Sequence, residues 1–334
     1  MTGRVSLVMP VYNEEGFIEA CLTSVVEDPE TEVLVVDGGS TDRTRDVVRA
    51  LMPRLPGVRL LDNPGRTAAS GMNIGIAAAT GEYIVRLDAH SVYPPGYVRR
   101  LVAALAEHGA DVSGGIIVPV PRRGTWFGRA VAASLTNRWV MGNAGFRLGG
   151  GGVRVVDTVP FGCWRADVLR RSGGYNEDLH RSQDYDLARR AAALGAKIIL
   201  VPDVVISYRA RSGLTENIRY TFWNGYWVGY PMVACRVRFA ARHLVPAAAC
   251  VAGAPLLAAG AASSSGWPLL PAAPYLAILV LSGLTAAREG PAVAALLPLI
   301  TAGTHVLYGL GTLYGIIRGA PARLSALRVR ARRG

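Results

Sequence analysis

The first half of the chain alternates short apolar runs with stretches of helical periodicity. The apolar runs cover residues 5–11, 32–37, 58–63 and 82–90. Such near-continuous runs are typical of parallel strands that are buried on both faces. The segments between and after them predict helices at 13–26, 42–52, 67–79 and 94–109. The alternation predicts an α/β fold of Rossmann-like type, with a mostly parallel sheet and helices on both of its faces.

The pattern becomes less regular between residues 110 and 208. We expect a strand at 114–120, a helix at 125–135, a helix that starts near Gln183, and two short strands at 197–201 and 203–208. A glycine-rich stretch, GNAGFRLGGGG, covers residues 142–152. A glycine-rich segment loses much conformational entropy when it is fixed in one conformation. This stretch is therefore either a lid over an acceptor or a plain surface loop.

Long apolar stretches are confined to the end of the chain, at 243–262, 267–287 and 291–317. Each is long enough to cross a bilayer, and Arg or Glu stands only between or outside them. The alternative, buried helices of a soluble domain, would require a far larger protein to cover them. The aromatic stretch before them predicts a helix in the membrane interface. The expected organisation is a catalytic domain at 1–208, a juxtamembrane segment at 209–242, a transmembrane region at 243–318 and a basic tail at 319–334.

Composition agrees with a membrane protein. Of the 334 residues, 51% are hydrophobic and only 18% charged, and the mean hydropathy is +0.27. The net charge is +12, and Lys197 is the single lysine among 36 basic residues. The arginines gather beside the apolar stretches, which favours lipid headgroups or a lipid phosphate over nucleic acid as the partner. Codon bias is an alternative reason for the excess of arginine over lysine.

Cysteine usage and the N-terminus bear on the compartment. Cys21, Cys163, Cys235 and Cys250 are scattered without C-x-x-C spacing, so we expect neither a disulfide framework nor a zinc site. Met1 leads straight into a strand pattern, without a basic region and an apolar signal core. We therefore expect the catalytic half to lie in the cytoplasm.

Polar side chains follow the predicted strands, where an open α/β sheet binds its ligand. Asp37 precedes two glycines that let the backbone approach a ligand, and its carboxylate can accept bonds from a uracil or a ribose. A turn residue before a helix is the alternative for Asp37. Asp88 and His90 are separated by one residue and can share a divalent metal with a diphosphate. The other candidates at this edge are Asn13, Glu14 and Arg66.

A second cluster of polar residues lies at 159–196, where Asp184 precedes a helix. Leu187 and Ala191 are the apolar positions that this helix turns inward. A carboxylate at the N-terminus of a helix is electrostatically favoured. Asp184 is therefore either a helix cap or a functional carboxylate.

Five motifs together resemble glycosyltransferase family 2, a family of inverting enzymes with the GT-A fold. In chain order they are VSLVMPVYNEE, VVDGGSTDRT, RLDAH, FGCWR followed by GGYNEDL, and QDYDLARR. The resemblance covers roughly residues 4–240. Within the family, the DAH triplet, the segment from Val156 to Leu187 and the hydrophobic tail are most similar to the succinoglycan-type exopolysaccharide glucosyltransferases.

The resemblance implies a role for each motif residue. It implies that Asp37 contacts the nucleoside, that Asp88 and His90 hold Mn²⁺ or Mg²⁺ and the diphosphate, and that Asp184 is the catalytic base. The remaining residues that it places at the nucleotide-sugar donor are Pro10, Tyr12, Glu14 and Arg66. Those that it places at the donor sugar and acceptor are Phe161, Gly162, Cys163, Trp164 and Gln183.

The sequence departs from the family pattern in three places. The usual D-x-D ends in His90, which leaves the metal preference open. The usual Glu-Asp before the catalytic helix is Gln183-Asp184, which keeps the aspartate. A Q-x-x-R-W motif is not present after the base, although Arg219 and Tyr220 occupy a comparable region. Processive synthesis of a long polymer is therefore not expected.

The resemblance implies a multi-pass enzyme of the inner membrane with a cytoplasmic catalytic domain. The expected reaction transfers glucose from a UDP-sugar to a polyprenyl-diphosphate-linked saccharide in exopolysaccharide biosynthesis. Its partners would be the nucleotide-sugar donor, the lipid-linked acceptor and the membrane, and not nucleic acid. The alternatives are a synthase of polyprenyl-phosphate sugars and a nonenzymatic membrane scaffold built on a decayed transferase domain.

Overall fold

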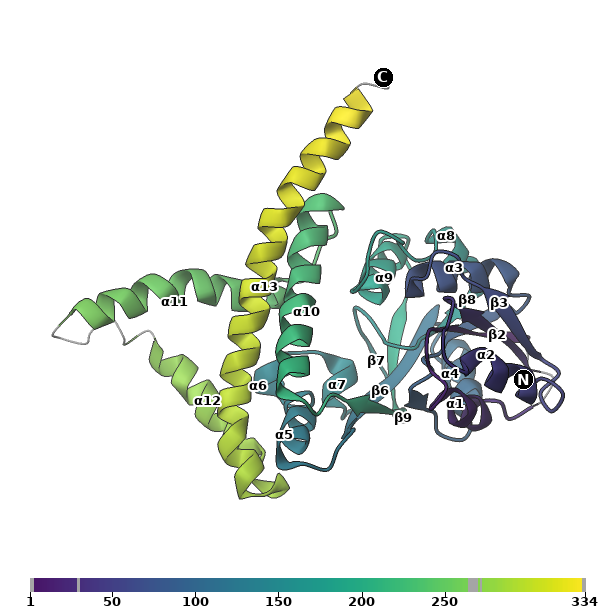
Figure 1. The fold of residues 1–334 in the computed structure, drawn as a ribbon, viewed down its shortest axis with the longest axis horizontal. Coiled ribbons are helices and arrows are strands. Elements are labelled where there is room, and N and C mark those ends of the chain that lie inside the picture. The colour runs from purple at the N-terminus through teal and green to yellow at the C-terminus, as the bar shows by residue number, and fades with distance from the viewer. Residues whose placement is uncertain (1–2, 29–30, 264–269, 271, 332–334) are drawn as a thin grey trace. The chain divides into compact units, whose positions relative to one another are not determined.

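The protein is described here by a computed structural model that covers residues 3–28, 31–263, 270 and 272–331 (Figure 1). The chain divides into two compact units. We call the first, Met1–Val118 with Gly145–Arg209, the sheet unit. We call the second, Pro119–Ala144 with Ala210–Gly334, the helical unit. Each unit is described by itself.

The sheet unit is built on one mixed sheet of nine strands in the order β3-β2-β1-β4-β8-β6-β9-β5, with β7 beside β9. The four apolar runs at the start of the chain are confirmed as neighbouring parallel strands: β1 (Val5–Val11), β2 (Glu32–Asp37), β3 (Val58–Asp62) and β4 (Tyr83–Arg86). The next strand, β8 (Cys163–Arg165), is antiparallel to both β4 and β6 (Val112–Pro121). The strands β5 (Ser91–Val92) and β7 (Arg154–Val155) are antiparallel to β9 (Ile198–Ala210).

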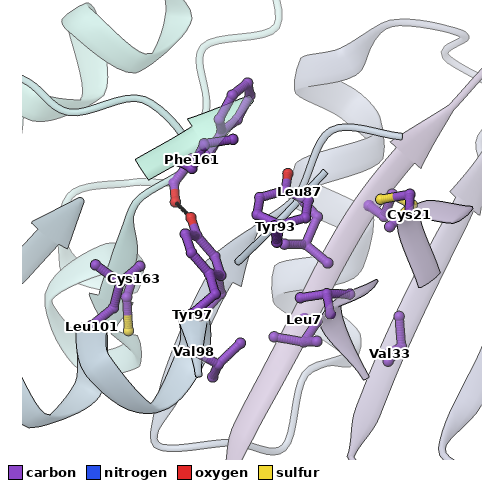
Figure 2. Packing of buried hydrophobic residues seen from close by; sticks show 14 of the residues in the cluster. Leu7, Cys21, Val33, Leu87, Tyr93, Tyr97, Val98, Leu101, Phe161 and Cys163 are labelled. Carbon is purple, nitrogen blue, oxygen red and sulfur yellow. Dashed lines mark hydrogen bonds between the residues drawn. The ribbon is translucent and has the colours of Figure 1, made fainter. Parts of the chain in front are cut away.

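Two hydrophobic clusters cover the two faces of the sheet, and β1 contributes to both. Leu7 and Met9 lie in the first cluster, which includes side chains of α1 (Ile18–Val25) and α4 (Tyr97–Glu107) and is shown in Figure 2. Val8 lies in the second, with side chains of α3 (Ala68–Ala78), α8 (Ala166–Arg171) and α9 (Gln183–Ala193). Burial of both faces explains why β1 is apolar at nearly every position. The other helices of this unit are α2 (Thr44–Leu51) and α7 (Gly145–Leu148).

Three predicted element boundaries were wrong. The first helix begins at Ile18 rather than residue 13, because Asn13 has a positive φ of 55° and Phe17 N–H bonds the Glu14 carbonyl in a turn. The strand predicted at 82–90 ends at Arg86, which leaves Asp88 and His90 in the connection. The two short strands predicted at 197–201 and 203–208 are one strand, β9, that continues through Pro202.

The helical unit contains α5 (Trp126–Ser134), α6 (Arg138–Met141), α10 (Leu214–Ala234), α11 (Val245–Ala262), α12 (Ala273–Thr285) and α13 (Pro291–Ala331). Glycines let α10 and α13 approach each other closely. A Cβ added to Gly225 would lie 2.0 Å from the Tyr308 carbonyl oxygen, and one added to Gly311 would lie 2.1 Å from that of Phe222. Small residues that recur every four positions along a helix, as Gly225 and Gly229 do on α10, permit such backbone contact with a neighbouring helix.

Among the residues that the structure describes, two helices are long and apolar enough to cross a membrane, by length and composition: Val245–Ala262 and Pro291–Pro321. The third predicted crossing, at 267–287, contains α12, a helix of 13 residues. A helix needs about 20 residues to cross a bilayer. Residues 267–269 and 271 of that segment lie outside the described residues. The predicted juxtamembrane segment at 209–242 is largely α10.

The two units divide the chain near residue 209 and also set residues 119–144 apart, while the predicted domain bounds stay a prediction. Residues 119–144 were predicted to belong to the catalytic domain, whereas they group with the helical unit. The physical reason is apolar packing: Ala130 and Val131 of α5 share a buried cluster with Val293 and Leu297 of α13. In addition, Asn137 donates a hydrogen bond to the Thr285 hydroxyl at 2.8 Å.

Candidate active site

The candidate site lies at the carboxyl ends of the parallel strands. Since β1 has β2 on one side and β4 on the other, the residues that follow these three strands meet at one edge of the sheet. Backbone hydrogen bonds hold the connections close. Gly38 N–H bonds the Val11 carbonyl at 2.9 Å, and Asn63 N–H bonds that of Asp37 at 2.8 Å.

Asp37 is buried at this edge, and its side chain is 0% exposed. Its carboxylate accepts hydrogen bonds from Gly39 N–H and Ser40 N–H, both at 3.1 Å, and from the Ser40 hydroxyl and Arg45. Burial alone would raise the pKa of Asp37, but the bonds from Ser40 and Arg45 hold this pKa below its usual range. The predicted nucleoside contact stays a prediction, and it requires one of these donors to move. In this structure Asp37 shapes the glycine turn.

Two other predicted donor residues, Arg66 and Tyr12, lie beside that turn. The Arg66 guanidinium lies over Gly39, with its Nε 3.5 Å from the position that a Cβ would take there. Tyr12 is 55% exposed, and its Cβ lies 3.8 Å from the corresponding position at Gly38. Pro10 is half-buried in β1. An exposed aromatic ring beside an arginine and an open glycine backbone suits a nucleobase and an anionic group.

The structure brings together Glu14, Asp88 and His90. His90 Nδ1 lies 2.7 Å from Asp88 Oδ1 and 3.3 Å from Glu14 Oε1. The His90 ring also contacts the Tyr208 ring, with 5.8 Å between centroids. Burial alone would lower the pKa of His90, but the hydrogen bonds with Asp88 and Glu14 raise it to about 9. The imidazole therefore carries a second proton at neutral pH, and a metal would have to displace this proton in order to bind, because a histidine ligand is neutral.

A divalent metal fits these residues in donor chemistry. Within the part of the chain that the structure describes, no group of three or more His, Cys, Asp or Glu side chains surrounds a point that would hold a metal. Asp88 and His90 would therefore supply two ligands. Mg²⁺ in particular is often held by one or two carboxylates together with substrate phosphates. Imidazole binds softer ions best, but it is a better ligand for Mn²⁺ than for Mg²⁺.

Asp184 lies in the first turn of α9, and the helix cap is Ser182, whose φ is 62°. The alternative that Asp184 is the cap was therefore wrong. Asp184 Oδ1 accepts hydrogen bonds from Arg86 Nη1 at 2.5 Å and from the Tyr175 hydroxyl at 3.1 Å. The Asp184 side chain is 33% exposed. One oxygen of the carboxylate is thus held by two hydrogen-bond donors, while the side chain remains partly open to solvent.

The predicted sugar and acceptor segment is buried. The exposed fractions of Phe161, Cys163 and Trp164 are 7%, 0% and 3%. The Tyr97 hydroxyl donates to the Phe161 carbonyl at 2.6 Å, as Figure 2 shows. Gly162 accepts a hydrogen bond from Arg86 N–H at 3.1 Å. In this structure these side chains are packed inside the sheet unit, and their contact with a sugar stays a prediction.

Gln183 is also buried, at 6% exposed, and its side-chain amide donates to the Leu179 carbonyl. This bond fixes the turn that leads into α9. The predicted contact of Gln183 with the acceptor stays a prediction as well.

Sequence reasoning missed Arg86, Tyr175 and Arg45 as members of the site. A signal existed for Arg86, because it is the one charged residue within the apolar strand YIVRL. Buried arginine is rare without a partner. Tyr175 and Arg45 carried no such signal, since tyrosine after glycine and arginine on a helix surface are both ordinary.

The fold is shared with a solved enzyme. The mannosyltransferase PcManGT from Pyrobaculum calidifontis, in complex with GDP-Man and Mn²⁺, matches 94% of this chain and 88% of its own, with 24% identity and a TM-score of 0.64. Together with the sheet order and the carboxylates at its edge, this likeness gives the sheet unit the GT-A fold of glycosyltransferases, as the sequence predicted.

The family follows from the sequence matches. Residues 6–166 match the model of glycosyl transferase family 2. Succinoglycan biosynthesis protein ExoA of Rhizobium meliloti is 29% identical over 229 residues, which are 67% of each chain. The undecaprenyl-phosphate 4-deoxy-4-formamido-L-arabinose transferase of Aeromonas hydrophila is 35% identical over 153 residues, 43% of this chain and 45% of the relative. Residues 6–166 are therefore a glycosyl transferase family 2 domain, which agrees with the family that the sequence predicted.

Proposed function

We propose that the protein transfers a sugar, with inversion, from a nucleotide-diphosphate sugar to a polyprenyl-diphosphate-linked saccharide in exopolysaccharide biosynthesis. The observation that carries the proposal is the state of Asp184. Its carboxylate is oriented by Arg86 and Tyr175 on one oxygen and is 33% exposed. A positioned, accessible carboxylate is the side chain that a displacement at an anomeric carbon requires as its base.

In the proposed reaction the acceptor hydroxyl gives its proton to Asp184 as its oxygen forms a bond to the anomeric carbon. The bond from that carbon to the diphosphate breaks, and the nucleoside diphosphate leaves with the electron pair. The new bond forms on the face opposite the leaving group, so the configuration inverts. A positioned base typically contributes about 10² to 10⁴ in rate.

Donor binding is assigned to the edge formed by the first two strands. Tyr12 and Arg66 offer a ring and a cation beside the glycine turn that Asp37 shapes, and Pro10 and Glu14 are assigned to the same donor site. Asp88 and His90 would hold Mn²⁺ or Mg²⁺, which neutralises charge on the leaving diphosphate when bound. The presence of GDP-Man and Mn²⁺ in the mannosyltransferase of similar fold supports this assignment. UDP-glucose is the donor favoured by the resemblance to the succinoglycan protein.

Membrane attachment is assigned to the helical unit. The two long apolar helices support attachment to the inner membrane, with the sheet unit on the cytoplasmic side, where nucleotide sugars are made. The arginines before the first apolar stretch agree with the positive-inside bias. A lipid-linked acceptor would then be held at the surface to which the enzyme is attached.

A donor screen on the full-length protein in detergent tests the proposal. Release of nucleoside diphosphate is measured for UDP- and GDP-sugars, with and without a polyprenyl-diphosphate-linked saccharide. We expect UDP-glucose turnover that rises when this acceptor is added. Absence of acceptor-dependent release for every nucleotide sugar would contradict the proposal.

The second candidate is a synthase of polyprenyl-phosphate sugars, whose acceptor is a phosphate. The 35% identity with an undecaprenyl-phosphate transferase supports it over 153 residues. The same screen separates the two functions when polyprenyl phosphate replaces the lipid-linked saccharide. A phosphate acceptor needs no strong base, so this second function also predicts a mild effect of Asp184→Asn.

A further inference from the structure

Arg86 ties three segments of the sheet unit together. Its backbone pairs with β1 at Val8, and its N–H donates to the Gly162 carbonyl at 3.1 Å. Its side chain reaches α9, where Nη1 lies 2.5 Å from Asp184 Oδ1. The backbone therefore fixes the position of Arg86 independently of the contact between its side chain and the carboxylate.

The Arg86 guanidinium is largely enclosed, and its side chain is 13% exposed. The cation lies over the Tyr175 ring, 5.5 Å from the ring centroid. A guanidinium keeps its proton throughout the physiological pH range, and the Asp184 carboxylate balances its charge. The charge is thus permanent, and the ring and the carboxylate stabilise it.

Tyr175 is fixed independently of Arg86. Its N–H donates to Asn73 Oδ1 and its carbonyl accepts from Asn73 Nδ2, both at 2.8 Å. Its side chain is part of the second hydrophobic cluster, and the residue is 3% exposed. The hydroxyl at the end of this anchored ring donates to Asp184 Oδ1 at 3.1 Å.

Both donors bind the same oxygen. Among the residues that the structure describes, Oδ1 takes Arg86 and Tyr175, and no side chain is seen to donate to Oδ2. Since the Asp184 side chain is 33% exposed, Oδ2 is the oxygen available to a ligand. Two donors from two anchored elements also define the plane of the carboxyl group.

We infer that Arg86 and Tyr175 are positioning residues that select Oδ2 of Asp184 as the proton-accepting oxygen and aim it at the acceptor hydroxyl. This inference rests on the proposed role of Asp184 as the base. A shift of about 1 Å in a reacting group can cost on the order of 10²-fold in rate. A residue that acts through Asp184 should lower kcat and leave the donor KM unchanged.

The test is a double-mutant cycle in the full-length protein, with UDP-glucose and a polyprenyl-diphosphate-linked saccharide as substrates. We expect Arg86→Met to lower kcat by about 10²-fold and Tyr175→Phe, which keeps the ring, to lower it by about tenfold. Arg86→Lys should restore part of the loss. In an Asp184→Asn background neither substitution should lower kcat further, because the group on which it acts is already gone.

Arg170→Met is the control. Arg170 donates to the Ala79 carbonyl at the end of α3. Among the described residues, no hydrogen bond of Arg170 goes to Asp184 or to the donor edge. We expect it to retain wild-type kcat. Thermal unfolding of each variant excludes loss of folded protein, and Tyr175→Phe keeps the test open if Arg86→Met does not fold.

The outcomes separate the inference from the proposed function. Additive losses in the Asp184→Asn background, or a loss that appears in the donor KM instead of kcat, would overturn the inference and leave the base assignment intact. Near-normal turnover of Asp184→Asn itself would overturn the base assignment, and the inference with it.

Discussion

Asp184 and Asp186 lie two residues apart on α9, and each carboxylate is held by a different arginine. Arg86 binds the first at 2.5 Å, and Arg190 binds the second at 2.9 Å. A two-residue step on a helix rotates a side chain by about 200°. Asp186 is therefore turned to the buried side, where it is 6% exposed, and it has an evident structural role.

Substitution of each aspartate by asparagine should separate their roles. We expect Asp184→Asn to lower kcat by about 10² to 10⁴ without weakening donor binding. Asp186→Asn should instead lower the free energy of unfolding by about 1–3 kcal/mol, because the charged partner of Arg190 is lost. Steady-state turnover, donor titration and thermal unfolding of both variants check this. The reverse pattern of activities would move the base to Asp186.

Removal of divalent metal should abolish turnover, and Mn²⁺ should restore it at least as well as Mg²⁺. The reason is the imidazole of His90, which suits manganese better than the harder magnesium ion. Turnover is measured with each metal at saturating donor after treatment with chelator. Full activity in chelator, or a strong preference for Mg²⁺, would show that His90 is not a ligand.

Close packing of α10 against α13 should make Gly225 intolerant of even a methyl group. A Cβ there would lie 2.0 Å from the Tyr308 carbonyl oxygen, so Gly225→Ala must push the two helices apart. We expect a loss of about 1–3 kcal/mol in stability, which is the usual cost of overpacking. Gly303→Ala is the matched control, because a Cβ at this position of α13 meets nothing within 4 Å. Equal thermal stability of the two variants in detergent would contradict the close contact.

The C-terminus should lie on the cytoplasmic side. With two full crossings the chain returns to the side from which it entered, and the basic tail at 319–334 then obeys the positive-inside bias. The helix α12 has 13 residues and spans only about 20 Å, less than the ~30 Å hydrocarbon core. Reporter fusions at Gly334 measure the side directly. An external reporter would mean three crossings and would exclude a hairpin.

The sequence was most informative where one physical requirement dominates. The apolar runs predicted the parallel strands, because a strand that is buried on both faces is apolar at nearly every position. The predicted first helix began too early, because Asn13 has a left-handed backbone. This conformation is held by bonds from Asn13 N–H to the Ser40 hydroxyl and from Thr41 N–H to the Asn13 side chain, and both partners are remote in the sequence.

The same limit applies to the candidate site. Asp37, Asp88 and Asp184 could be singled out, because they follow strands or begin a helix. The partners that orient them could not: Arg86 and Asp184 are 98 residues apart, and nothing local to either predicts their contact. The burial of Cys163 and Trp164 was likewise hidden, since it follows from the pairing of β8 between β4 and β6.

The insertion of residues 119–144 into the helical unit bears on how the chain is made. The Asn137 side chain bonds Thr285, 148 residues later, and Arg129 bonds the Glu289 carbonyl, 160 residues later. During synthesis, α5 and α6 emerge from the ribosome long before the helices that cover them. Domains generally fold as units, N-terminal parts first. Here the packing of Ala130 and Val131 against Val293 and Leu297 can form only after almost the whole protein has been translated.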